Sequence, residues 1–72
     1  MEQKIINLIK LNYNLDDFFA ITFYEKAETN LHGWYSDEKY AKYSQMGYDL
    51  KLNNRHFTGT KNNITITLSK LY

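Results

Sequence analysis

The sequence contains no cysteine, no proline and only three glycines among its 72 residues. The absence of cysteine excludes disulfide bonds and thiolate metal sites, and it is typical of proteins from a reducing compartment. No stretch approaches the ~20 apolar residues of a transmembrane helix. The first residues also lack the charge pattern and cleavage site of a signal peptide. We therefore expect a protein of the bacterial cytoplasm that does not contact membranes.

Neither sign of charge dominates, since nine basic and eight acidic residues leave a net charge of +1. This balance excludes a mimic of polyanions and argues against a protein that holds nucleic acid mainly by bulk charge. The residue choices favour Lys, Asn, Ile, Tyr and Phe, all of which have AT-rich codons. That bias indicates a low-GC bacterium or one of its mobile elements, such as a phage.

Aromatic residues are abundant and make up 17% of the chain. A single domain of this length buries only about 60% of the surface that its unfolded chain exposes. Each buried aromatic side chain removes roughly 150–250 Å² from water, so these residues supply the dense core that so short a chain needs. We expect one domain over residues 1–72.

The longest run that could be entirely buried is residues 18–24, which reads as a β-strand. One register places Phe19, Ile21 and Phe23 on the same face, and the opposite face is also mostly apolar. A strand that is apolar on both faces belongs in the middle of a sheet. The sequence therefore predicts that this strand is central.

Two segments fit helices. Residues 2–12 place isoleucines on one helical face, although β-branched isoleucine leaves a strand as the alternative. The second helix is better delimited: Ser36 is a typical N-cap, acidic residues follow it, and Gly47 suits the left-handed position after the last turn. We expect this helix to lie on the sheet.

Three further strands are expected at residues 31–35, 48–53 and 64–69, the last two from strict alternation. Gly33 inside the first indicates a bulge or a close backbone approach. Residues 54–63 are interpreted as the ends and turn of a hairpin, with Gly59 at the bend. The predicted fold is a small two-layer α+β sandwich of order α-β-β-α-β-β, in which an antiparallel sheet of about four strands carries one or two helices on one face. The predicted core is Ile5, Ile9, Phe19, Ile21, Phe23, Trp34, Tyr40, Leu50, Leu52, Ile64, Ile66 and Leu68.

No catalytic or cofactor motif is recognisable. The two histidines, His32 and His56, do not fit a common zinc-ligand spacing, and the serines lack the glycine elbow of serine hydrolases. The segment around Gly59 lacks the second glycine and the helix of a phosphate-binding loop. We therefore expect a protein that is not an enzyme and that has no catalytic residues, metal or cofactor.

The aromatic surplus is the most informative functional feature. Tryptophan and tyrosine dominate binding hot spots because they bury a large area at little cost in entropy. The same rings could instead fill a core that is poor in leucine, and the sequence alone leaves both interpretations open. The candidate protein-binding residues are Trp34, Tyr35, Tyr40, Tyr43 and Tyr48.

A weaker pattern gathers basic residues near the second hairpin. Lys51, Arg55, His56 and Lys61, together with neighbouring asparagines and Phe57, could contact a phosphate backbone and stack a base. Such charges also commonly protect a sheet edge from pairing. Nucleic-acid binding through residues 51–61 is therefore the alternative function.

The leading hypothesis is a small binding protein that occludes or bridges a protein partner. If the coding bias reflects a phage, a host-directed inhibitor of the anti-defence or anti-CRISPR type is the natural role. Pairing with a second copy, through a sheet edge or through the aromatic patch, is a further expectation.

Overall fold

The computed structural model of the chain describes residues 7, 9–23 and 28–70, and for Phe23 it describes the backbone alone. Residue 7 and residues 9–12 are helical, which confirms a helix within the segment expected at 2–12. The expected core positions Ile5 and the Phe23 side chain lie outside the described part. The remaining elements are η1 (Leu15–Asp17), β1 (Ala20–Phe23), β2 (Thr29–Trp34), α2 (Asp37–Gln45), β3 (Lys51–Asn53), β4 (His56–Lys61) and β5 (Ile64–Ser69).

The five strands form one mixed sheet in the order β1-β2-β5-β4-β3. Strands β2 and β5 are parallel, and every other neighbouring pair is antiparallel. The predicted α+β class is confirmed. The sheet has one strand more than expected, and its parallel pair arises because α2, β3 and β4 intervene between β2 and β5.

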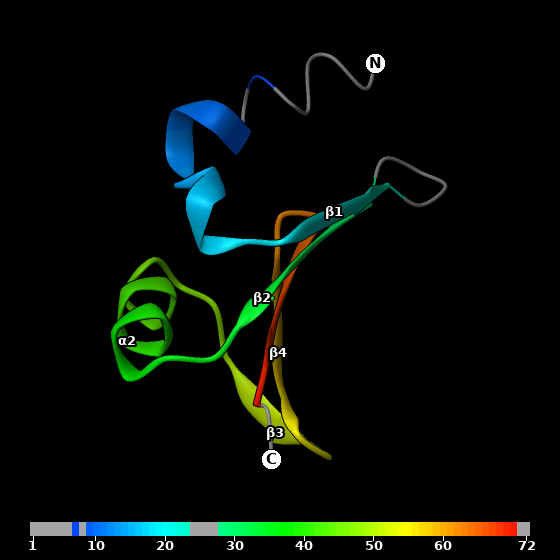
Figure 1. Ribbon diagram of the computed structural model, residues 1–72. Helices are drawn as coiled ribbons and strands as arrows, with labels where there is room; N and C mark the ends of the chain where they lie inside the picture. The colour runs from blue at the N-terminus through cyan, green and yellow to red at the C-terminus, as the bar shows by residue number, and fades with distance from the viewer. Residues whose placement is uncertain (1–6, 8, 24–27, 71–72) are drawn as a thin grey trace.

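Both helices lie on the same side of the sheet (Figure 1). Burial alternates along β2 and β5, as expected of strands with one covered face. The core cluster on the covered face consists of Ile9, Leu31, Tyr43, Tyr48, Leu50, Ile64, Ile66 and Leu68. Five of these were predicted; Leu31 and the two tyrosines were not.

The prediction that residues 18–24 form the central strand is wrong. Strand β1 lies at one border of the sheet and pairs only with β2, whereas β5 has a neighbour on each side. Phe19 is 55% exposed and Ile21 is 37% exposed. Two other predicted core residues, Trp34 and Leu52, are also at least half exposed. Tyr40 packs against the core while remaining partly buried.

The ends of α2 are confirmed. The Ser36 hydroxyl accepts a hydrogen bond from the Lys39 amide at 3.1 Å, which satisfies one of the free N–H groups of the first turn. Gly47 has a φ of +107°, a conformation that residues with a Cβ rarely adopt. The helix buries Tyr43 against the sheet.

Residues 54–63 were expected to form the ends and turn of a hairpin with its bend at Gly59, and that bend is wrong because β4 occupies the middle of the segment. Positive φ values occur at Asn54, Asn62 and Asn63, so asparagines form the turns on either side of β4. Gly59 lies within the strand instead. A Cβ at this position would lie 2.8 Å from the Asp49 carbonyl oxygen, so the glycine permits close backbone packing.

Contacts to β2 and α2 hold η1 in place. The expected close approach at Gly33 is confirmed, since a Cβ there would lie 2.4 Å from the Asp17 carbonyl oxygen. The Asp17 carboxylate accepts hydrogen bonds from the Tyr43 hydroxyl at 2.6 Å and from the Lys42 ammonium at 2.9 Å. Desolvation raises the pKa of Asp17, but these two donors outweigh it and hold that pKa below its ordinary value.

Candidate functional site

The side of the sheet opposite α2 and the N-terminal helix is not covered by any described element (Figure 1). Because alternate residues of a strand point to opposite faces, the residues between the buried positions of β2 and β5 belong to this side. Strand registers extend the assignment across the sheet. We call this surface the outer face; its residues are Phe19, Ala20, Thr22, Asn30, His32, Trp34, Lys51, Asn53, His56, Thr58, Thr60, Thr65, Thr67 and Ser69.

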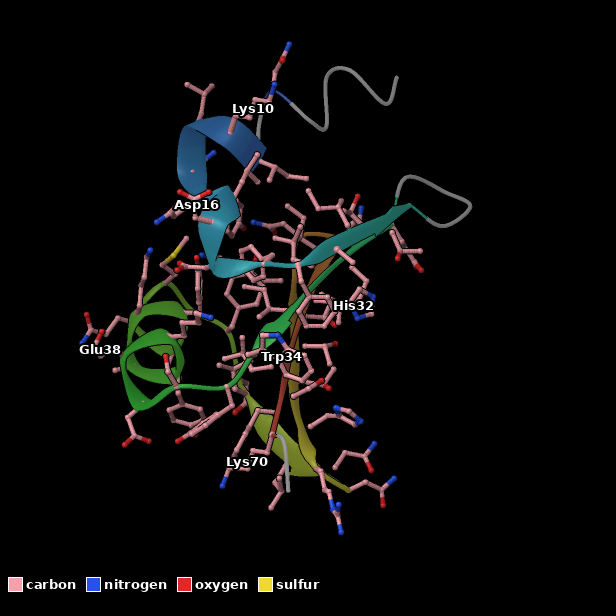
Figure 2. The ribbon with its side chains drawn as sticks, viewed as in Figure 1. Lys10, Asp16, His32, Trp34, Glu38 and Lys70 are labelled. Carbon is pink, nitrogen blue, oxygen red and sulfur yellow. The ribbon has the colours of Figure 1, made fainter. Side chains whose placement is uncertain are left out.

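An aromatic pair stands at one end of the outer face. The rings of Phe19 and Trp34 lie 4.9 Å apart between centroids, and the His32 ring lies 6.4 Å from Phe19. Phe19 is 55% exposed and Trp34 is 50% exposed. In Figure 2, His32 projects to the side of the sheet away from α2, and Trp34 lies further along β2. The two rings therefore form an apolar surface that is open to solvent.

Phe19 reaches the outer face because the chain bulges at the start of β1. Ala20 is the register partner of His32, yet the Phe19 amide donates to the His32 carbonyl oxygen at 2.8 Å. Two consecutive residues thus lie opposite one, which is the arrangement of a β-bulge. The extra residue breaks the alternation, so Phe18 packs on the Tyr43 ring inside while Phe19 lies outside. Simple alternation placed Phe19 in the core, which is why it was not a candidate.

In the middle of the outer face, threonine hydroxyl groups form hydrogen bonds with one another or with neighbouring polar side chains. The Thr60 and Thr65 hydroxyls are 2.7 Å apart, and the Thr67 hydroxyl donates to the Asn30 side-chain oxygen at 3.2 Å. These bonds leave the polar groups partly satisfied before any ligand arrives. Covering this region with another surface therefore costs less free energy than covering unpaired hydroxyls.

Formal charge is nearly absent from the outer face. Lys51 is its only charged residue within the described strands, and this residue also pairs with Asp49 at 3.4 Å. The chain as a whole is 24% charged, and exposed strand faces commonly carry lysine and glutamate. Few charges and solvent-exposed aromatic side chains, here those of Phe19 and Trp34, are features that the cores of protein–protein interfaces share.

The five aromatic residues predicted to bind protein do not form one surface. Trp34 lies on the outer face, whereas Tyr43 and Tyr48 are 0% and 3% exposed and belong to the core. Tyr35 and Tyr40 lie on the helix side, where both pack against Phe57 with centroids 5.0 Å away. The Tyr35 hydroxyl donates to Asp37, and this hydrogen bond raises the pKa of Tyr35.

The basic residues of the alternative function do not converge either. Arg55 lies in the turn before β4 and His56 is the first residue of the strand. Lys61 lies at the far end of β4, where its ammonium group donates to the Met46 carbonyl oxygen. Five residue steps of about 3.3 Å separate the backbones of His56 and Lys61 by roughly 17 Å. Lys51 projects from the neighbouring strand and pairs with Asp49. The predicted basic tip is therefore a dispersed set of charges.

His56 and Ser69 form the one pair that resembles part of a catalytic set. Their Nδ1 and Oγ atoms are hydrogen-bonded at 2.7 Å across β4 and β5. Among the described residues no carboxylate hydrogen-bonds to this imidazole, as the third member of a serine hydrolase triad would. The pair also lies on an open sheet surface, with His56 exposed. We interpret it as part of the polar network of the outer face.

A depression of about 240 Å³ is lined by Asn12, Tyr13, Met46, Lys61, Asn62 and Ile64. Ligand pockets usually occupy about 300–1,000 Å³, and the cation here already donates to a backbone carbonyl. Within residues 7, 9–23 and 28–70, no three histidine or acidic side chains cluster as a metal site would require.

Comparison of the chain with protein-family models, curated proteins and solved structures gives no significant match. No helix in the described part of the chain is both long and apolar enough to cross a membrane. The composition and geometry of the outer face make it the candidate site.

Proposed function

We propose that this chain is a small binding protein without catalytic activity, and that its outer face docks onto a protein partner. The observation that carries the proposal is an exposed Phe19–Trp34 pair on a sheet surface with a single charged residue. Surfaces that stay in contact with water gain nothing from exposed aromatic side chains and a lack of charge. The cores of interfaces, by contrast, are enriched in aromatic residues and depleted of charge.

The polar groups of the outer face favour a protein surface over a nucleic acid. Nucleic acids are held largely by cations that neutralise phosphates, and Lys51 is the one cation on this face. Base recognition also needs free donors and acceptors, while the Thr60 and Thr65 hydroxyls are already paired with each other and the Thr67 hydroxyl donates to Asn30. A partner that covers the face needs only to be complementary in shape and apolar where it meets Trp34.

The size of the outer face sets the expected affinity. The five strands have from three to six residues each and lie about 4.8 Å apart, which gives the sheet a surface of roughly 400 Å². A standard protein interface buries about 800 Å² on each partner. Contact through the outer face alone therefore suits a modest affinity, and a partner that also reaches the rim would bind more tightly. Covering a partner's own binding surface is how such a protein would inhibit a host protein, in keeping with the phage-type composition.

The test immobilises the full chain and passes over it a lysate of a low-GC bacterial host, with captured proteins identified by mass spectrometry. Trp34→Ala is the test variant, because tryptophan is enriched among interface hot spots, whose truncation costs about 2 kcal/mol or more. We expect the affinity for the captured partner to fall at least about 30-fold. Leu52→Ala is the matched control, since Leu52 is also exposed but is excluded from the outer face by its register opposite Phe57.

Capture that Trp34→Ala and Phe19→Ala leave at the wild-type level would refute docking through this face. Circular dichroism of each variant must match the wild type for the comparison to count. A parallel titration with a single-stranded oligonucleotide at low salt distinguishes the alternative: tight binding that Arg55→Ala weakens, and that salt abolishes, would favour nucleic acid instead.

A further inference from the structure

The border of the sheet at β1 presents unpaired backbone groups, and the hydrogen bonds of β2 show which ones. The Thr29 amide donates to the Asn63 carbonyl oxygen at 3.0 Å, and the Tyr35 amide donates to that of Ser69 at 2.8 Å. Odd-numbered residues of β2 therefore direct their backbone groups toward β5, and even-numbered residues direct theirs toward β1.

The same assignment shows which residues of β1 direct their backbone groups toward β2. Ala20 and Thr22 lie opposite His32 and Asn30, so they are the residues that hydrogen-bond to β2. Ile21, between them, directs its N–H and C=O away from the sheet. No other described strand pairs with β1 on that side. Ile21 therefore offers one donor and one acceptor at an open edge.

Of the features with which sheets prevent pairing, this edge has a short strand of four residues and the bulge at its start, but it has no charge and no proline. Natural edges carry lysines, prolines or very short strands. At the opposite border, β3 has only three residues and includes the exposed Lys51. Strand β1 contains neither charge nor proline, and the exposed side chains of Phe19 and Ile21 accompany it. The two borders of the same sheet thus differ in their protection.

We propose that β1 pairs antiparallel with β1 of a second copy of this chain, about a two-fold axis at Ile21. Antiparallel partners must share the face to which their side chains point. With the axis at Ile21, each Ile21 meets its counterpart on the helix side, and each Ala20 meets Thr22 of the second copy on the outer face. The two Ile21 backbones then exchange two reciprocal hydrogen bonds.

The lack of charge on β1 is compatible with a second copy as the occupant, and the small area of contact defines how tightly that copy binds. No residue of β1 is charged, so the self-paired strands bring no like charges together. Strands this short bury less than the about 1,200 Å² of a standard interface. The dimer is therefore weak and forms at high protein concentration. It joins the two sheets edge to edge and leaves both outer faces free, so it is independent of the proposed function.

The wild-type chain supplies the first test. Sedimentation equilibrium from about 10 μM to about 1 mM should show a mass rising from 8.6 kDa toward twice that value. Over the same range, amide hydrogen exchange of Ile21 should slow with concentration. The Thr22 amide, which faces Asn30 of β2, serves as an internal control whose exchange stays slow throughout. A constant monomer mass with concentration-independent exchange at Ile21 would overturn the proposal.

Variants provide the second test. Ile21→Lys places two like charges on the axis and should leave a monomer at every concentration. Leu52→Lys is the matched control, because it introduces the same charge at an exposed aliphatic position of the other edge strand. Ile21→Pro removes only an outward N–H and tests the same contact if the lysine variant unfolds. A dimer that persists in a folded Ile21 variant would refute edge pairing. Loss of partner capture in Trp34→Ala would test only the proposed function of the outer face, so the two proposals can fail separately.

Discussion

Thr29 is the only polar residue among the described residues that is fully buried, with 1% of its surface exposed. Within the described part of the chain its hydroxyl has no hydrogen-bond partner, and its register neighbour is the apolar Ile64. A buried hydroxyl without a partner costs about 1–3 kcal/mol of stability. This cost identifies a position at which a single substitution should improve the protein.

We predict that Thr29→Val raises the free energy of unfolding by about 1 kcal/mol, because valine has the same shape without the unpaired group. The urea midpoint should rise while the slope of the transition stays the same. Thr67→Val is the control: its hydroxyl donates to Asn30, so the same chemical change should bring no gain. A lower midpoint for Thr29→Val would show that the hydroxyl has a partner in solution.

Single residues also show where sequence reasoning succeeded and failed. Ser36 and Gly47 were identified correctly because a helix cap depends on its immediate neighbours. Gly59 was misassigned because glycine serves two purposes, and here it permits close approach of the Asp49 backbone instead of a bend. The bends belong to asparagines, which also tolerate a positive φ.

At the scale of elements, the placement of η1 depends on the missing side chain of Gly33 in β2. The nearest atoms to an added Cβ would be the Asp17 carbonyl oxygen at 2.4 Å and the Phe18 ring at 3.2 Å. The first of these is backbone, so it cannot rotate away. The Gly33 position thereby couples the strand to the segment that carries Asp17 and Phe18.

We predict that Gly33→Ala destabilises the protein by about 1–3 kcal/mol, the range for overpacking at a buried contact. The variant should also lose protection from amide exchange in residues 15–18, because η1 must move away. The control is His32→Ala, at a neighbouring position on the outer face, where we expect a change of about 0.5 kcal/mol or less. An unfolding midpoint for Gly33→Ala equal to that of the wild type would contradict this packing.

For the whole molecule, two buried tyrosine hydroxyls connect the N-terminal part of the chain to the rest of the core. Tyr43 donates to Asp17, and Tyr48 shares a hydrogen bond with Tyr13. Desolvation by burial raises the pKa of both Tyr43 and Tyr48, and these hydrogen bonds raise it further. The folded state therefore holds both protons to a higher pH than the unfolded chain does.

We predict that the protein loses stability as pH rises above about 10, the ordinary pKa of tyrosine, because the unfolded state then releases protons that the folded state retains. The contribution of each tyrosine is complete below that pH, and its loss approaches about 1.4 kcal/mol per pH unit above it. Urea midpoints measured from about pH 8 to about pH 11 test this. Tyr48→Phe should be less stable at pH 8 but should show a shallower decline. Equal slopes for both proteins would contradict the assignment.

The sequence by itself determined the local features: the capped helix, the alternating strand β5, and a two-layer α+β arrangement able to bury an aromatic-rich core. These follow from periodicity and end signals within a few residues of each other. The tertiary structure alone decided that β1 is a border strand and that β5 is central, because strand order depends on pairings between distant segments. It also divided the aromatic residues, placing Tyr43 and Tyr48 inside and Phe19 and Trp34 outside. One extra residue at the start of β1 reverses the face on which Phe19 lies, and no local pattern records that shift.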